Sequence, residues 1–252
     1  MIQCVKCGSE IADNSKFCSE CGAPQVKECP ICRAKMALTA KFCSECGALY
    51  KQPVVVPAVP KFTIPAPVEN NNTIVDLRDG QIYRTVKIGS QTWLSENFAF
   101  FSSNSFVYAN RLTHAKEYGR LYTWNRAKLI APPGWHLPTR EDFAELVECC
   151  KQLGTDPIGV MLKSNTDEWK EHGIFGDGVP GKDIVGFDAR PMGSRTSSGV
   201  YNYLGNFAYF WCADEADNNR AYYRHLSYFS GDFKELATSK DCAFSVRLVK
   251  NK

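Results

Sequence analysis

The sequence has no long apolar run and no marked excess of charge of either sign. Its 252 residues include 30 Lys and Arg against 27 Asp and Glu, a formal net charge of +3. No apolar stretch approaches the ~20 residues that a membrane-spanning helix requires, so we expect no membrane insertion. The near balance of charge argues against a polyanionic partner or an anionic membrane surface. Residues 1–30 also lack a charged segment followed by an apolar run and a cleavage site, so we expect a reducing, cytoplasmic location.

Cysteine, in contrast, is abundant, and eight of the 12 cysteines lie within the first 46 residues. They form two copies of Cys-x2-Cys, ten residues, Cys-x2-Cys, and the second copy is displaced by 25 residues. Four thiolates around one point form the tetrahedral shell that Zn²⁺ prefers, and such a closed shell leaves no position for a catalytic water. We therefore predict two structural zinc sites, with the ligands Cys4, Cys7, Cys18 and Cys21 in the first and Cys29, Cys32, Cys43 and Cys46 in the second.

Two alternatives to this ligation are weaker. A disulfide framework requires an oxidising compartment, for which the sequence has no targeting signal. A site across the repeats, from Cys18, Cys21, Cys29 and Cys32, is less favoured because the 25-residue period makes each repeat complete. Each repeat is too short to bury a core of its own, so we expect the metal to supply most of its folding free energy.

The charge of the zinc-binding segment argues against nucleic-acid binding. Residues 1–50 hold six Lys and Arg against five Asp and Glu. Four thiolates on one Zn²⁺ leave each site with a formal charge of about −2, so the clustered positive patch that phosphate binding needs is missing. We expect this segment to contact protein.

Composition divides the chain into four segments: zinc ribbons at 1–25 and 26–49, a linker at 50–72 and a domain at 73–252. Five prolines in the linker exclude a helix and favour an extended spacer, although its valines permit a strand-like contact.

The pattern of the large segment predicts an α+β domain. Alternating apolar residues at 82–88, a Gly-Ser turn and residues 91–94 predict a β-hairpin. Thr139 as N-cap, with Asp142 in the capping-box position, predicts a helix that ends before Gly154. We also expect a weaker helix within 122–130, long loops over 173–205 and a C-terminal strand over 244–248.

Several phrases of this domain occur in a characteristic order. They lie at residues 79–89, 93–97 (Trp-Leu-Ser-Glu-Asn), 118–124, 133–139, 186–189 (Gly-Phe-Asp-Ala), 221–224 and 244–247 (Phe-Ser-Val-Arg). With them, residues 73–252 resemble the Fibrobacter succinogenes major paralogous domain family. The resemblance implies a C-type-lectin-like domain, related in fold to formylglycine-generating enzymes. It also suggests a variable protein of a diversity-generating retroelement, in which a C-terminal stretch is mutated to vary a binding surface.

A strand over 221–229 would suit such a display, because alternate residues of a strand face opposite sides. One set can anchor the fold while the other contacts a ligand. We predict a non-enzymatic binding protein with a protein ligand, since aromatic and small polar residues suit adaptable recognition; carbohydrate is the alternative ligand. The anchoring set is Tyr222, Arg224, Leu226 and Tyr228, and the predicted ligand-binding residues are Trp211, Asp214, Tyr223, His225, Ser227, Phe229, Asp232 and Phe233.

Two rival functions remain open at this point. An enzyme on the same fold would use Cys212 or Cys242 with a metal, although no basic partner at fixed spacing predicts a lowered thiol pKa. A scaffold protein would act through its zinc ribbons alone. His136, between two apolar residues, is expected to be packed and hydrogen-bonded, and residues 176–183 depart from a P-loop because Asp183 replaces its Ser or Thr.

Overall fold

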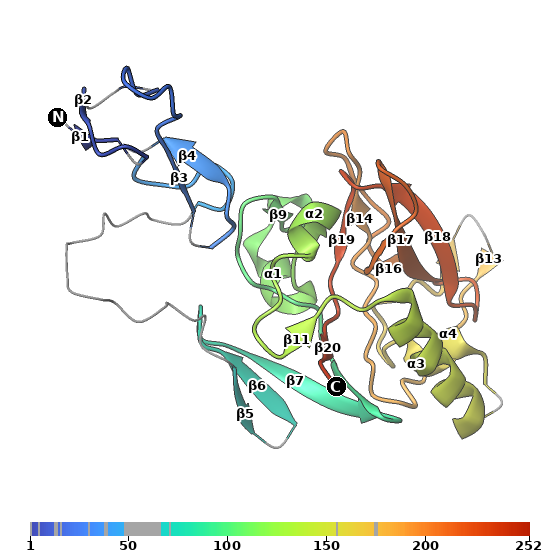
Figure 1. Cartoon of the computed structure of the whole chain (residues 1–252). Helices are drawn as coiled ribbons and strands as arrows, with labels where there is room; N and C mark the ends of the chain where they lie inside the picture. Colours follow the sequence, from blue (N-terminus) through green and yellow to red (C-terminus); the bar gives the residue numbers. More distant parts are fainter. Residues whose placement is uncertain are drawn as a thin grey trace. The chain divides into compact units, whose positions relative to one another are not determined.

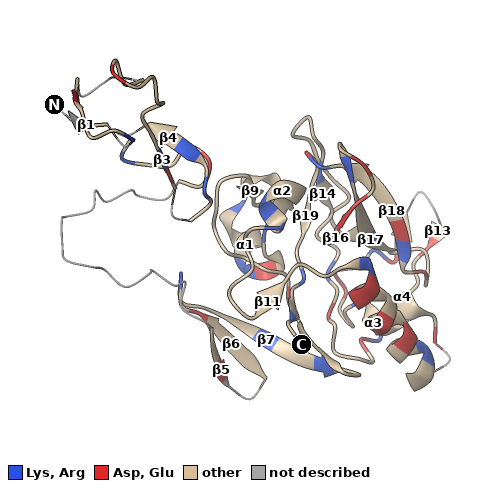
Figure 2. Ribbon diagram, in the orientation of Figure 1, with Lys and Arg blue, Asp and Glu red and all other residues tan. Residues whose placement is uncertain are grey.

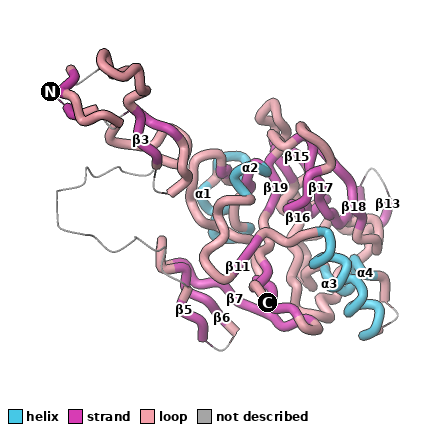
Figure 3. Tube along the Cα trace, viewed as in Figure 1, coloured by secondary structure: helices cyan, strands magenta, loops and turns pink. Residues whose placement is uncertain are grey.

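The computed structural model describes residues 2–252 apart from residues 5, 13, 14, 16, 30, 38, 39, 48–66, 71, 155, 174 and 175. The chain divides into two compact units, Met1–Phe62 with Ser102–Asn104, and Thr63–Phe101 with Ser105–Lys252 (Figure 1). Strands and loops predominate, and helices are few (Figure 3). Most of the predicted linker lies outside the described residues.

The first unit consists of short antiparallel hairpins. Strand β1 (Ile2–Gln3) pairs with β2 (Glu10–Ile11), and β3 (Val26–Glu28) pairs with β4 (Lys35–Ala37). Each hairpin adds one fully buried apolar side chain to its cysteines, Ile11 in the first and Met36 in the second. An isolated two-stranded hairpin is only marginally stable in water, so these hairpins need the cysteine clusters to hold them.

The second unit is built on two sheets. The eight-stranded sheet has the order β15-β14-β19-β16-β17-β18, with β10 pairing both β19 and β9. Its strands are β9 (Ser105–Phe106), β10 (Leu121–Thr123), β14 (Ser194–Arg195), β15 (Tyr201–Asn202), β16 (Phe207–Glu215), β17 (Arg220–Ser227), β18 (Lys234–Ser239) and β19 (Ala243–Ser245). The six-stranded sheet has the order β11-β20-β8-β7-β6-β5. Its strands are β5 (Val68–Asn70), β6 (Thr73–Asp76), β7 (Gln81–Ile88), β8 (Gln91–Leu94), β11 (Trp135–His136) and β20 (Val249–Lys250). A separate pair joins β12 (His172–Gly173) to β13 (Gly176–Asp177).

The predicted hairpin is confirmed as β7 and β8, which meet at the pair Ile88 and Gln91. The C-terminal strand is shorter than predicted, because the chain leaves the first sheet after β19 and joins the second at β20. Between them, the carbonyls of Val246 and Leu248 accept hydrogen bonds from Phe98 and Leu94. Strand β5 pairs with β6 and lies in the segment assigned to the linker, so the second unit begins before Thr73.

The capped helix is confirmed at the predicted residues as α3 (Arg140–Leu153). Its capping box is complete, since Thr139 Oγ1 accepts from Asp142 N at 3.1 Å and Asp142 Oδ2 accepts from Thr139 N at 2.8 Å. The weaker helix is confirmed in shortened form as α2 (Trp124–Ala127). No sequence pattern predicted the other helical segments, which are a 3₁₀ turn at Tyr108–Asn110, α1 (Leu112–Tyr118) and α4 (Ile158–Leu162).

Strands β16 and β17 bury side chains on both of their faces. Leu226 and Tyr228 pack in one cluster with Phe143 of α3, whereas Trp211 belongs to a second cluster with Tyr223 at its edge. Within β17, which ends at Ser227, the two predicted sets of alternate residues therefore do face different sides of the sheet. Beyond the strand the alternation fails, because Phe229 packs against the same cluster as Leu226 and Tyr228.

A fully buried arginine ties the segment between β19 and β20 to β8 and to the loops that hold Asn97 and Phe187. Arg247 Nη1 donates to the carbonyls of Leu94 and Phe187, and Nη2 donates to Asn97 Oδ1 at 2.9 Å and to Asp188 O at 3.2 Å. Burial lowers the pKa of Arg247 to about 10, so the guanidinium remains charged at neutral pH. A buried cation of this kind is tolerated because its donors meet several acceptors.

Candidate functional site

The first unit holds two clusters of four cysteines. In each cluster, one sulfur from every residue lies within 4.8 Å of the others. Closest Sγ–Sγ distances are 3.6 Å for Cys4 and Cys21 and 3.3 Å for Cys29 and Cys46. Four sulfurs at the Zn–S bond length of about 2.3 Å would lie roughly 3.8 Å apart, so both clusters fit a tetrahedral zinc ion. The clusters are the predicted within-repeat sets, and the cross-repeat alternative is wrong.

The same tight turn positions every pair of ligands. The backbone N–H four residues after the leading cysteine of each pair donates to that cysteine's carbonyl, at 2.8–3.0 Å. The four donor residues are Gly8, Gly22, Arg33 and Gly47, all with positive φ. Glycine adopts this conformation without strain, and Arg33 alone holds it with a side chain.

Each cluster holds a cysteine whose thiolate is clearly favoured and another whose thiolate is disfavoured: the pKa is lowered for Cys4 and Cys43 and raised for Cys21 and Cys32. Backbone N–H groups of Cys7 and Lys6 lower the pKa of Cys4 to about 6. Burial raises the pKa of Cys43, but hydrogen bonds from the backbone of Cys46 and Glu45 outweigh it and give a value of about 7. Zinc binds the deprotonated sulfur, so these hydrogen bonds prepare the shell for the metal.

The second unit carries an aromatic face on strands β16, β17 and β18. We define this aromatic face as Phe207, Tyr209, Tyr223, His225 and Leu236, flanked by Tyr203 and Phe229. The register places Tyr209 opposite His225, and Tyr223 opposite Leu236. Ring centroids lie 5.8 Å apart for Tyr209 and His225 and 5.9 Å for Phe207 and His225.

The aromatic face is only partly covered. Leu236 and Tyr203 each keep 48% of their surface exposed, and Phe207, Tyr223, His225 and Phe229 are half-buried. Strand β18 ends the order of its sheet, so in the described part of the chain no strand pairs with its outer edge. An apolar surface beside an unpaired strand edge is the kind of feature at which proteins add a partner.

Three predicted ligand-binding residues are buried, so their prediction as surface contacts is wrong. Trp211 is completely buried because its ring packs on Phe244 at 4.4 Å and its Nε1 donates to Tyr122 O at 2.8 Å. Ser227 is 6% exposed. Phe233 faces the opposite core, where its ring meets Phe143 at 5.7 Å.

The other predicted residues fall into two groups. Tyr223, His225 and Phe229 lie on or beside the aromatic face. Asp214 and Asp232 do not: Asp214 Oδ2 accepts from Arg140 N at 2.7 Å at the start of α3, and the exposed Asp232 pairs with Lys234 at 3.3 Å. The structure therefore brings together only part of the predicted set.

Burial keeps His225 neutral. Desolvation, with a smaller contribution from Lys234, lowers the pKa of His225 to about 4. At neutral pH the imidazole is thus an aromatic surface with one donor and one acceptor nitrogen.

Two of the four cysteines of the second unit, Cys150 and Cys212, are not arranged as reactive thiols. Burial raises the pKa of Cys212 to about 12 and that of Cys150 to about 11. A reactive thiol needs the opposite shift. His136 is half-buried and hydrogen-bonded as predicted, with Asp142 Oδ2 at 3.0 Å from Nε2 and Asn251 Oδ1 at 2.7 Å from Nδ1.

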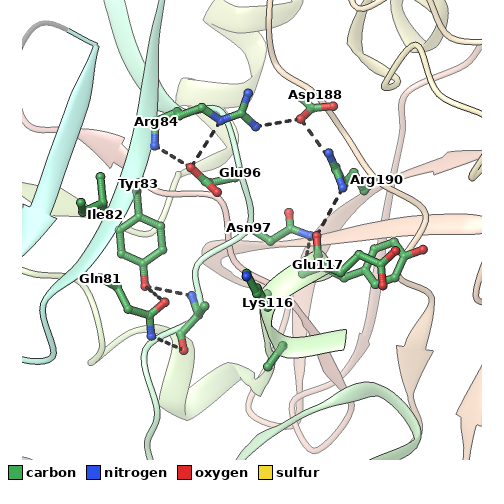
Figure 4. Close-up of a pocket in the computed structure, with 14 residues that line it drawn as sticks. Gln81, Ile82, Tyr83, Arg84, Glu96, Asn97, Lys116, Glu117, Asp188 and Arg190 are labelled. Atoms are coloured by element: carbon green, nitrogen blue, oxygen red, sulfur yellow. Dashed lines mark hydrogen bonds and ion pairs between the residues drawn. The ribbon is translucent and has the colours of Figure 1, made fainter. Parts of the chain in front are cut away.

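A polar cavity of about 360 Å³ opens on another part of the second unit (Figure 4). Side chains from β7, the loop after β8, helix α1 and the segment 188–190 line it. No sequence pattern predicted this cavity, although phrases at 79–89, 93–97, 118–124 and 186–189 all contribute lining residues.

Basic and acidic residues are interspersed along the second unit, and helix α3 carries residues of both signs (Figure 2).

Two four-cysteine clusters and a domain of two sheets define a zinc-ribbon protein with a mostly β domain. The chain belongs to the Fibrobacter succinogenes major domain family, whose model matches residues 86–250. The double zinc ribbon model matches residues 4–47, which include all eight cluster cysteines. No curated protein and no solved structure matches the chain. Within the described residues, no helix combines the length and apolar composition needed to cross a bilayer.

Proposed function

We propose that the protein is a non-enzymatic binding protein that recognises a protein partner through the aromatic face of a C-type-lectin-like domain. The observation that carries the proposal is the partly buried cluster of aromatic rings on β16 and β17, next to the edge of β18 with which no described strand pairs. Aromatic side chains supply large contact area at low conformational cost, and the strand edge supplies backbone donors and acceptors.

The shape of the face favours protein over carbohydrate as the ligand. Leu236 projects from the middle of β18 and lies opposite Tyr223, so an apolar side chain of a partner would contact both. Buried apolar contact of this kind dominates the centres of protein interfaces. Carbohydrate remains the second candidate, because the open rings could also stack on a sugar.

A peptide library displayed on phage tests the proposal while the partner is unidentified. We expect selection on the zinc-loaded full chain to enrich peptides that lose at least tenfold in affinity for Leu236→Glu, which places a charge on the edge strand of the face, opposite Tyr223. Leu129→Glu is the matched control, since Leu129 is 60% exposed and lies outside the aromatic face.

The two variants also separate the alternatives. Enriched peptides that bind Leu236→Glu as tightly as the original chain would contradict the proposed surface. A glycan array probed with the same variants tests the second candidate. If no peptide is enriched, and a glycan binds the original chain but not Leu236→Glu, the ligand of the aromatic face is a sugar and not a protein. Equal melting temperatures of the two variants verify that Leu236→Glu acts on binding rather than on folding.

We further propose that the C-terminal surface varies among copies of the protein. The alternation on β17 supports this, because Leu226 anchors the fold in one core cluster while Tyr223 and His225 face the partly open side. A reverse transcriptase gene nearby, with a near-copy of the 3′ coding end that differs at adenines, is the expected genomic signature. If the genome holds no such copy of the 3′ coding end, the C-terminal surface does not vary in this way and the proposal is wrong.

The zinc ribbons are proposed to dock a second protein. Phe17 and Phe42 precede the third cysteine of their repeats and expose 64% and 61% of their surface. Equivalent exposed aromatics on two repeats give a repeated contact point. In affinity capture, a partner retained by the original chain and by Leu112→Ser, but lost with Phe17→Ser and Phe42→Ser together, would support this role. Retention by the double variant would refute it.

The rival enzyme would require a reactive thiol in the second unit. The raised pKa values of Cys150 and Cys212 favour structural roles for both. Thiol alkylation combined with an oxygen-consumption assay separates the two functions, since the binding protein consumes no oxygen before or after alkylation.

A further inference from the structure

The polar cavity of the second unit has a rigid wall. Asn97 Nδ2 donates to Tyr118 O at 2.9 Å, and Asn97 Oδ1 accepts from the buried Arg247. Gly119 has a φ of 78°, and a Cβ there would lie 2.7 Å from Asn97 O, so the end of α1 packs directly on the loop after β8. The cavity is therefore preformed, which lowers the entropic cost of binding a ligand.

Two arginines of the cavity are already neutralised. Arg84 Nη2 lies 3.1 Å from Asp188 Oδ2 and its Nε lies 3.6 Å from Glu96 Oε1. Arg190 lies 3.6 Å from the same Asp188 carboxylate and 3.2 Å from Glu168. Asp188 is thus shared between two guanidinium groups, which it holds in place at the rim.

Lys116 and Glu96 are groups of opposite charge that remain available, and the exposed Glu117 has no ion pair among the described residues. Among the described residues, the Lys116 ammonium has no carboxylate partner. Glu96 uses only Oε1, which accepts from Arg84 N at 2.6 Å, and its Oε2 has no hydrogen-bond partner in the described part of the chain. Figure 4 shows the two side chains at the same cavity, Glu96 from the loop after β8 and Lys116 from helix α1.

We propose that this cavity binds a small zwitterion of the free α-amino acid class. Its carboxylate would accept from Lys116, its ammonium would donate to Glu96 Oε2, and Asn97 would bound the space between them. The lining residues Arg84, Lys116 and Arg190 balance Glu96, Glu117 and Asp188, so the cavity has no net formal charge. A ligand with one charge would pair with only one of these two groups, whereas a zwitterion pairs with both and gains two charge-assisted hydrogen bonds.

The first experiment is a thermal-shift screen of the zinc-loaded full chain with a panel of L-amino acids at equal concentration. Acetate, methylammonium and glycerol are included as single-charge and uncharged probes. We expect at least one amino acid to raise the melting temperature more than all three probes. No shift with any amino acid, or an equal shift with acetate, methylammonium or glycerol, would overturn the proposal.

Calorimetry with the best amino acid then assigns the two contacts. Its N-acetyl and C-terminal amide derivatives each lose one charge, and we expect each to bind about tenfold or more weakly, as the loss of a charge-assisted hydrogen bond implies. Glu96→Gln should weaken binding of the free amino acid but should not further weaken binding of the N-acetyl form. Lys116→Gln should likewise weaken binding of the free amino acid but not that of the amide.

Matched controls keep this result interpretable. Glu141→Gln and Lys87→Gln remove the same charges at exposed positions outside the cavity and should leave affinity unchanged. Derivatives that bind as tightly as the parent, or cavity variants with unchanged affinity, would refute the assigned contacts. The aromatic face is untouched by all four substitutions, so failure here is independent of the proposed protein recognition.

Discussion

Acidification should destabilise the second unit through His225. The imidazole lies among Phe207, Tyr209 and Tyr223, and burial lowers its pKa from 6.5 to about 4. The folded state therefore binds fewer protons than the unfolded state between these two values. Stability is unaffected above pH 6.5 and falls as the pH drops from 6.5 towards 4.

The size of the effect follows from the two pKa values. Full titration is worth about 3 kcal/mol, since each pKa unit corresponds to about 1.4 kcal/mol. Between pH 7.5 and pH 5 the expected loss is about 2 kcal/mol in the free energy of unfolding. His225→Gln removes the titrating group and should remove this part of the pH dependence, although it also changes the stability at neutral pH by about 1 kcal/mol.

Urea denaturation followed by tryptophan fluorescence measures the effect. The quantity of interest is the difference between wild type and His225→Gln in their pH dependence, because the zinc ligands and other histidines contribute equally to both. His172→Gln serves as the control, since His172 is 78% exposed. An unchanged pH dependence in His225→Gln would show that the imidazole is already solvated and would refute its proposed place in the aromatic face.

Three further predictions concern the metal, a helix cap and a close approach. Mass spectrometry under native conditions should find two zinc ions per chain and one in Cys18→Ser, and chelation should unfold residues 2–47 while the melting of the second unit stays unchanged. Thr139→Ala should lower the free energy of unfolding by about 1 kcal/mol, since it removes the capping box of α3; no loss would contradict the cap. Gly119→Ala should cost about 2–4 kcal/mol, because it adds a clash with Asn97 to the strain of a positive φ. Gly134→Ala is its control, with a comparable positive φ and nothing within 4 Å of the new Cβ, so equal losses would refute the clash.

Local patterns carried most of the successful predictions. Both zinc shells follow from the spacing of the cysteines alone, because four sulfurs at these intervals have one economical arrangement. Helix α3 was predictable in full since its capping box and apolar spacing agree, and the β7–β8 hairpin since its turn and alternation agree. Helices α1 and α4 were not, because they are short and their ends have no side-chain cap.

The two buried cations were not predicted from the sequence. Lys163 is completely buried, and its ammonium donates to Ser227 O at 3.2 Å and Ser230 O at 3.1 Å. Burial lowers the pKa of Lys163 to about 8. Arg247 and Lys163 both donate hydrogen bonds to backbone carbonyls of segments far apart in the chain, and no local sequence pattern predicts such partners.

Alternation along a strand predicts which face of the sheet a side chain lies on, but not how deeply it is buried, and the aromatic face shows why. Trp211 and Tyr223 are register partners and point to the same side, yet only Trp211 is fully buried. Phe244 of β19 packs on both rings, at 4.4 Å from Trp211 and 4.9 Å from Tyr223, so it does not make the difference. Trp211 has a further partner in β10, since its Nε1 donates a hydrogen bond to Tyr122 O. Tyr223 lies one strand further from β19, beside the edge strand β18, where the eight-stranded sheet ends. The accessible part of the site is therefore set by strand order, which the sequence of β17 alone does not contain.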